Sequence, residues 1–166
     1  MIESIDDPRI RLYRHKSKSS IPALRNEGFD LARGKYIAIF DSDDLAPVYR
    51  LEEQFRYMEE NPEIDVISGD FQIIGTDIVT NFPSDHDAIC YAFLFRCYIA
   101  NSAAFLRKGK IVQSHVRYRT EYFVCSDYGY WIDLIPYVRF HNLKGKPYLY
   151  YRRKVSRQTP PMKRRS

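Results

Sequence analysis

The chain has 166 residues and a formal net charge of +5, with 45% hydrophobic and 28% charged residues. This length and composition are ordinary for one soluble domain with a core of its own. No apolar run is long enough to cross a bilayer, and the N-terminus has no hydrophobic signal segment, so we expect a cytoplasmic protein. The three cysteines form neither a disulfide framework nor a zinc-binding pattern.

The first half of the chain predicts a helix, a buried strand and a second helix. Ser19 or Ser20 caps the first helix, Pro22 lies in its first turn, and Gly34 ends it. Residues 36–40 form an apolar run without polar alternation, which is typical of a strand buried on both faces in a parallel sheet. The second helix runs to about residue 60. Two apolar sides are expected on these helices: Ile21, Leu24 and Leu31 on the first, and Val48, Leu51, Phe55 and Met58 on the second.

The second half predicts short strands that alternate with helices. A helix capped by Ser84 is expected to reach about residue 95, and another begins at Ser126 and Asp127 and is distorted or ended by Pro136. Residues 108–110 read as a turn. The expected strands are 65–68, 71–74, 101–106 and 148–151, with a short one at 10–13 in the first half.

Three carboxylates follow the buried strand directly. Asp41, Asp43 and Asp44 come within four residues of one another, where the strand ends. Ligands bind at the carboxyl ends of strands in α/β sheets, and carboxylates so close together repel unless a cation or donors offset them. A divalent ion held by oxygen ligands would do so. The alternative is a turn in which Asp41 or Ser42 caps the next helix and the other carboxylates are solvated.

The basic residues are concentrated in two places. The stretch from Arg9 to Arg25 has no acidic residue and precedes the carboxylates, which makes a phosphate-bearing ligand plausible. From Tyr150 to Ser166 there are seven basic residues and no acidic ones. We therefore divide the chain into a domain at 1–155 and a basic C-terminal tail at 156–166. The tail is favoured as a solvated end, and contact with anionic lipid or nucleic acid is the alternative.

The order of these segments resembles the inverting family 2 glycosyltransferases of the GT-A fold, from about residue 6 to residue 156. The stretches at 23–28 and 32–38 look like the helix and strand that lead into the family's metal motif. Asp41-Ser42-Asp43-Asp44 resembles its DXD motif. Ser126-Asp127-Tyr128 with Trp131 resembles the later segment that carries the catalytic base, and Tyr151-Arg152 the start of a closing motif.

The resemblance implies an α/β fold with a GT-A-like, Rossmann-like mixed sheet flanked by helices. Such enzymes begin with a strand, a helix and a second strand that hold the nucleotide, and these are absent ahead of Asp6, so we expect an N-terminally truncated domain. Ser126 stands where the family usually has Glu. Lys154 stands where it commonly has His, and a protonated lysine cannot ligate a metal.

The implied reaction is metal-assisted transfer of a sugar, with inversion, from a nucleotide-sugar to an acceptor hydroxyl. Asp127 would be the general base, and Asp43 with Asp41 would hold Mn²⁺ or Mg²⁺. The residues implied to contact the donor are Asp41, Asp44, Arg25 and Lys154. The residues implied to contact the acceptor are Asn101, together with Ser102, and Trp131.

Each of these roles has a structural alternative. Asp127 would also suit a helix cap, Arg25 a solvent-facing helix position, and Asn101 the start of a strand. For Trp131 a place in the core is favoured, because it continues an apolar helix face.

The implied setting is synthesis of a bacterial surface polysaccharide. The expected partners are a donor, most simply a UDP-sugar, and a glycan or lipid-linked acceptor. A homodimer and contact with the inner face of the membrane through the tail are also considered. The rival hypothesis is a non-catalytic binding or remnant domain that cannot bind a donor alone.

Overall fold

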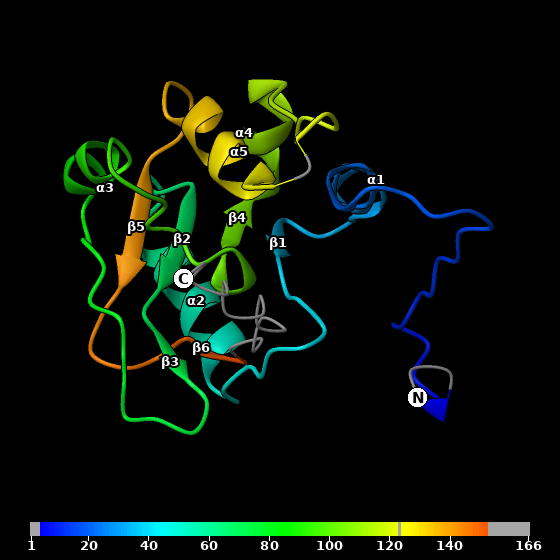
Figure 1. Ribbon diagram of the computed structural model, residues 1–166, viewed down its shortest axis with the longest axis horizontal. Coiled ribbons are helices and arrows are strands. Elements are labelled where there is room, and N and C mark those ends of the chain that lie inside the picture. The colour runs from blue at the N-terminus through cyan, green and yellow to red at the C-terminus, as the bar shows by residue number, and fades with distance from the viewer. Residues whose placement is uncertain (1–3, 123, 153–166) are drawn as a thin grey trace, which may run out of the picture.

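The computed structural model describes residues 4–122 and 124–152. Its centre is a four-stranded mixed sheet in the order β1-β4-β2-β5, in which β4 is antiparallel to both of its neighbours and β2 is parallel to β5. These strands are β1 (Tyr36–Ala38), β2 (Val66–Gly69), β4 (Phe105–Arg107) and β5 (Phe140–Leu143). Below them in Figure 1, β3 (Phe71–Ile73) pairs in parallel with β6 (Leu149–Tyr151).

Helices cover both faces of the central sheet. One face packs against α1 (Ile21–Leu31), α3 (His86–Ala92), α4 (Lys108–Ser114) and α5 (Ser126–Leu134), and the other against α2 (Arg50–Glu60), which lies behind the strands in Figure 1. Successive strand residues point to opposite faces. Leu106 therefore joins the first core cluster, and its neighbour Phe105 joins the second.

The start of α1 is as predicted, but its buried side is not. Ser20 Oγ accepts a hydrogen bond from the backbone N–H of Ala23 (3.4 Å), and a proline lies in the first turn. Ile21 and Leu24, which were expected on the buried side, are exposed. Phe29 enters the core instead, because α1 meets the body through the side that carries this ring.

The prediction for β1 is partly wrong. The strand exists, but it lies at the edge of the sheet and is antiparallel to its one neighbour, β4. Ile37 is half-buried and Ala38 is exposed. The expected burial of both faces is therefore not met, and an apolar run carries no information about what lies beside the strand. The edge position could therefore not be read from the sequence.

The prediction for the buried face of α2 is also wrong. Val48, Leu51 and Phe55 were expected in the core, yet Leu51 and Phe55 are 56% and 51% exposed and Val48 just before the helix is fully exposed. Of the expected stripe only Met58 is buried. The inward face of the helix is polar instead, for a reason given by its hydrogen bonds below.

Three further expectations change in detail. The turn expected at 108–110 is the first turn of α4, and β5 was not predicted. The strand expected at 101–106 is divided into a 3-10 turn, η2 (Asn101–Ala103), and β4. Residues 10–13 are not a strand. Among the helices of the described residues, none has the length and apolar character that crossing a membrane would need.

Candidate active site

The turn at residues 41–44 after β1, here called the acidic turn, contacts two distant parts of the chain. Asp41 Oδ2 accepts a hydrogen bond from Ser102 Oγ of η2 (2.8 Å). Its other oxygen, Oδ1, lies 3.5 Å from Nη2 of Arg25 on α1. The Arg25 side chain is only 18% exposed, so it does not take the solvent-facing position that was the alternative for it. The turn between β1 and α2, the turn before β4 and helix α1 therefore meet at one carboxylate.

Asp44 of the same turn contacts the segment that follows β6. It is only 6% exposed, and its Oδ1 accepts a hydrogen bond from the backbone N–H of Arg152 (3.1 Å). Leu45 and Tyr150 exchange backbone hydrogen bonds beside it. The end of β6 is thereby fixed against the acidic turn, which explains why the segment at 151–152 is near the site.

A buried polar pair, Arg50 and Gln54, connects α2 to the sheet and fixes the start of the acidic turn. Buried Arg50 donates from Nη2 to the carbonyl of Ile39 (2.8 Å) and from Nε to Gln54 Oε1 (3.1 Å). Gln54 Nε2 in turn donates to the carbonyl of Ala103 (2.7 Å). Burial lowers the pKa of Arg50 to about 10, and the nearby Asp44 carboxylate opposes that shift. These bonds to the backbone leaving β1 and entering β4 are the reason that α2 buries polar side chains.

Asp127 lies in the first turn of α5, directly after a sharp change in backbone direction. Cys125 adopts the left-handed region (φ 54°), which is uncommon for a residue with a side chain. Asp127 is half-buried, and its Oδ1 accepts a hydrogen bond from the backbone N–H of Tyr128 (3.0 Å). The N-cap residue Cys125 makes no side-chain cap. Similarly, no side chain of the acidic turn caps α2, whose N-cap is Tyr49.

One cavity of about 310 Å³ brings together four of the eight predicted site residues: Asp41, Asp44, Asn101 and Asp127. It is lined by Asp41, Asp44, Phe71, Ala100, Asn101, Ser102, Asp127, Leu149 and Tyr151. Carboxylates from the acidic turn and from α5 thus share one space, although they are far apart in the sequence. Asp43 is half-buried on the same turn, and Lys154 and the basic tail lie outside the described residues.

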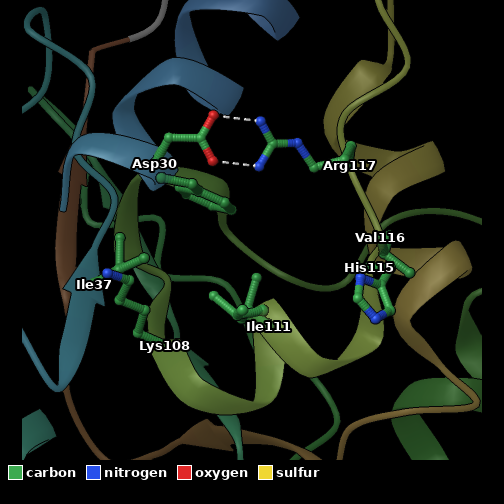
Figure 2. A pocket seen from close by; sticks show the side chains of 9 residues that line it. Asp30, Ile37, Lys108, Ile111, His115, Val116 and Arg117 are labelled. Carbon is green, nitrogen blue, oxygen red and sulfur yellow. Dashed lines mark hydrogen bonds and ion pairs between the residues drawn. The ribbon is translucent and has the colours of Figure 1, made fainter.

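A separate hollow of about 360 Å³ lies between α1 and α4, beside the edge strand (Figure 2). Its floor is apolar, with Ile37 and Ile111, and Asp30 and Arg117 pair across it through two hydrogen bonds of 2.6 Å. None of the predicted site residues lines it. We therefore place the candidate active site at the cavity that contains the acidic turn.

Trp131 does not fit the acceptor role assigned to it. Its side chain is fully buried and packs against Tyr130 and Phe140 in the first core cluster. A sugar stacks only on a ring face that is open to solvent, and this ring has none. The core position favoured for Trp131 is therefore the one that the structure shows.

Asn101 lies in η2 on the cavity wall, and its environment was not predictable. It is 8% exposed, and its Oδ1 accepts a hydrogen bond from the hydroxyl of Tyr118 (3.2 Å). Tyr118 was missed by the sequence reasoning because it lies in an irregular segment with no motif around it. Phe71 of the small sheet was likewise not expected to line the site, whereas Tyr151 was singled out only as part of the closing motif.

The carboxylates offer an incomplete metal site. Within residues 4–122 and 124–152, no three His, Cys, Asp or Glu side chains are grouped so that they could hold a metal ion. Mg²⁺ and Mn²⁺ nevertheless prefer carboxylate oxygens, and Mg²⁺ commonly binds one or two of them together with substrate phosphates. The acidic turn therefore suits a cation that its carboxylates bind together with a diphosphate. It suits a cation held by protein ligands alone less well.

The comparisons with known proteins agree on the class. The sequence model of glycosyl transferase family 2 matches residues 1–127, and the chain belongs to this family. An uncharacterized glycosyltransferase of Methanocaldococcus jannaschii is 32% identical over 133 residues, which cover 78% of this chain and 46% of the relative. A UDP-Glc:α-D-GlcNAc-diphosphoundecaprenol β-1,3-glucosyltransferase of Escherichia coli is 26% identical over 81% of this chain and 52% of its own.

Solved structures give the same answer for the fold. S. aureus TarS in complex with UDP-GlcNAc superposes with a TM-score of 0.66 at 16% identity, over 88% of this chain and 43% of that one. The family resemblance and the GT-A-like α/β fold are thereby confirmed. The chain spans about half the length of the curated relatives it matches.

Proposed function

We propose that this domain transfers a sugar from a nucleotide-sugar to an acceptor hydroxyl with inversion at the anomeric carbon. The observation that carries the proposal is the shared cavity of Asp41, Asp44 and Asp127. An acidic turn suited to a cation and a separate carboxylate suited to accept a proton face the same space. Membership of the family makes this chemistry the expected one.

Asp127 is proposed as the general base. The acceptor hydroxyl gives its proton to this carboxylate while its oxygen attacks the anomeric carbon, opposite the departing diphosphate. The new bond to the acceptor forms as the bond to the diphosphate breaks, so a single displacement inverts the centre. A single displacement needs no protein nucleophile.

The leaving diphosphate requires positive charge near the acidic turn. Arg25 supplies one fixed cation, since its guanidinium already lies beside Asp41. Asp43 and Asp41 would hold Mn²⁺ or Mg²⁺, which when bound neutralises charge developing on the diphosphate. Asp44 is assigned to the donor side because it lines the cavity. Lys154 remains a prediction for the donor side.

The proposed donor is a UDP-sugar and the proposed acceptor a glycan or a lipid-linked glycan. Two observations support this choice: the TarS structures include complexes with UDP and UDP-GlcNAc, and the E. coli relative is named for glucose transfer to a diphosphoundecaprenol-linked sugar. A role in polysaccharide synthesis on the cytoplasmic side of a membrane follows from these substrates. Membrane contact through the tail and homodimer formation remain predictions.

The test compares two carboxylates of the same helix. Asp127→Asn is expected to lower sugar transfer by about 10²- to 10⁴-fold, as loss of a general base does, and to leave UDP binding in the presence of Mn²⁺ unchanged. Asp133→Asn is the control, because Asp133 pairs with Arg119 at the surface of α5. Equal activity of the two variants would refute the role of Asp127. Thermal stabilisation of the wild-type chain by UDP with Mn²⁺ tests donor binding, and no shift with any nucleotide would favour a non-catalytic binding domain.

A further inference from the structure

The amide nitrogen of Asn101 is a buried donor that lacks a partner. Its Nδ2 is shielded from solvent and makes no hydrogen bond within the described residues, while the residue lines the cavity with Asp41 and Asp127. Leaving such a group unsatisfied costs about 1–3 kcal/mol. Buried polar groups are almost always paired, so an exception on a cavity wall indicates that a ligand oxygen or water completes it.

Tyr118 determines which way the Asn101 amide faces. Its side chain is almost fully buried, and burial raises the pKa of the phenol, so the hydroxyl keeps its proton and donates to Asn101 Oδ1. With the oxygen of the amide engaged by Tyr118, the nitrogen must point elsewhere. The ring of Tyr118 is itself held by stacking on Tyr130, with centroids 4.0 Å apart.

The backbone of Tyr118 is anchored to α1. Asn26 Oδ1 accepts a hydrogen bond from its N–H (2.9 Å), and Asn26 Nδ2 donates to its carbonyl (2.8 Å). The guanidinium carbon of Arg25 lies 5.3 Å from the centroid of the Tyr118 ring. Tyr118 therefore supports Arg25 through its ring face and Asn101 through its hydroxyl, and a substitution can separate the two contacts.

We propose that Tyr118 is a positioning residue that holds the Asn101 amide so that Nδ2 donates a hydrogen bond to the sugar acceptor. The atom bound is the oxygen of a hydroxyl other than the attacking one, since a hydrogen bond donated to the attacking oxygen would lower its nucleophilicity. This assignment rests on the proposed transfer reaction. It makes Asn101 a contact to the acceptor and leaves the donor to Arg25 and the acidic turn.

The kinetic test uses two neighbouring tyrosines. Tyr118→Phe removes the hydroxyl that orients Asn101 and keeps the ring beneath Arg25. Tyr130→Phe is the matched control, because its hydroxyl is buried beside Tyr118 and makes no hydrogen bond within the described residues. We expect Tyr118→Phe to raise the acceptor KM about 5- to 10-fold, the effect of one lost hydrogen bond, without changing the Kd for UDP and Mn²⁺. The control keeps both values.

Two kinetic results would overturn the proposal. If Tyr118→Phe and Tyr130→Phe have the same acceptor KM, the hydroxyl does not position Asn101 for the acceptor. If Tyr118→Phe weakens acceptor and UDP binding in parallel, Tyr118 supports the packing of the whole site rather than one amide.

A second measurement does not depend on activity. The side-chain ¹⁵N amide signals of Asn101, assigned with Asn101→Asp, are expected to shift or broaden in Tyr118→Phe and to stay in place in Tyr130→Phe. Unchanged Asn101 signals in Tyr118→Phe would refute the positioning role. If the wild-type chain transfers no sugar, the proposed function fails, and these signals still decide whether Tyr118 orients Asn101.

Discussion

The buried polar pair of Arg50 and Gln54 gives the most direct test of how the site is built. Gln54 is fully buried and makes two hydrogen bonds, one to the carbonyl of Ala103 and one from Nε of Arg50. Gln54→Leu keeps a similar volume and leaves both partner groups buried without it. Each unsatisfied group costs about 1–3 kcal/mol, so we expect the free energy of unfolding to fall by about 3 kcal/mol.

Urea denaturation followed by tryptophan fluorescence measures this loss. The chain has one tryptophan, and Trp131 is fully buried, so its emission reports global unfolding. Glu52→Gln is the control, since Glu52 is exposed on the same helix, and it is expected to change stability by less than about 0.5 kcal/mol. Arg50→Met combined with Gln54→Leu should cost less than the two single changes together, because they share one bond. If Gln54→Leu lowers the free energy of unfolding by less than about 1 kcal/mol, the hydrogen bonds of Gln54 do not stabilise the fold as proposed.

Four further substitutions test the fold. Leu51→Gln on the exposed face of α2 should change the free energy of unfolding by about 0.5 kcal/mol or less. Met58→Ala on the buried face should lower it by about 2–5 kcal/mol. Equal losses for the two variants in urea denaturation would contradict the orientation of the helix. Gly69→Ala should cost about 1–3 kcal/mol in the same assay, because a Cβ there would lie 2.6 Å from the ring of Tyr148; an unchanged midpoint would contradict this packing. Burial lowers the pKa of His86, whose Nδ1 accepts a hydrogen bond from the backbone N–H of Phe140 (3.2 Å). The unfolded chain therefore takes up a proton before the folded one as the pH falls through about 6.5, and stability should decrease from pH 7.5 to 5.5. His86→Gln should flatten this dependence, and an unaltered slope would show that His86 is not its source.

Sequence patterns singled out the residues of the candidate site because the patterns are local. The run that ends in Asp41, Asp43 and Asp44 marks a strand followed by an acidic turn, and Asp127 marks the first turn of a later helix. Both signals depend on residue type and short spacing, which a single sequence displays. The same local information predicted the helix that begins after Ser20, since a cap and a proline in the first turn act within a few residues.

Tertiary structure decided what no local pattern contains. Ser102, Arg25 and Tyr118 come from separate segments, and their contacts exist only because the sheet and α1 bring them beside Asp41 and Asn101. The inward face of α2 is polar because its side chains satisfy backbone carbonyls just after β1 and just before β4, so hydrophobic periodicity assigned the wrong face. The amino-acid sequence thus determined which residues are candidates for the proposed chemistry, and long-range packing determined which of them share a cavity, since hydrogen bonds between distant segments have no signature in sequence spacing.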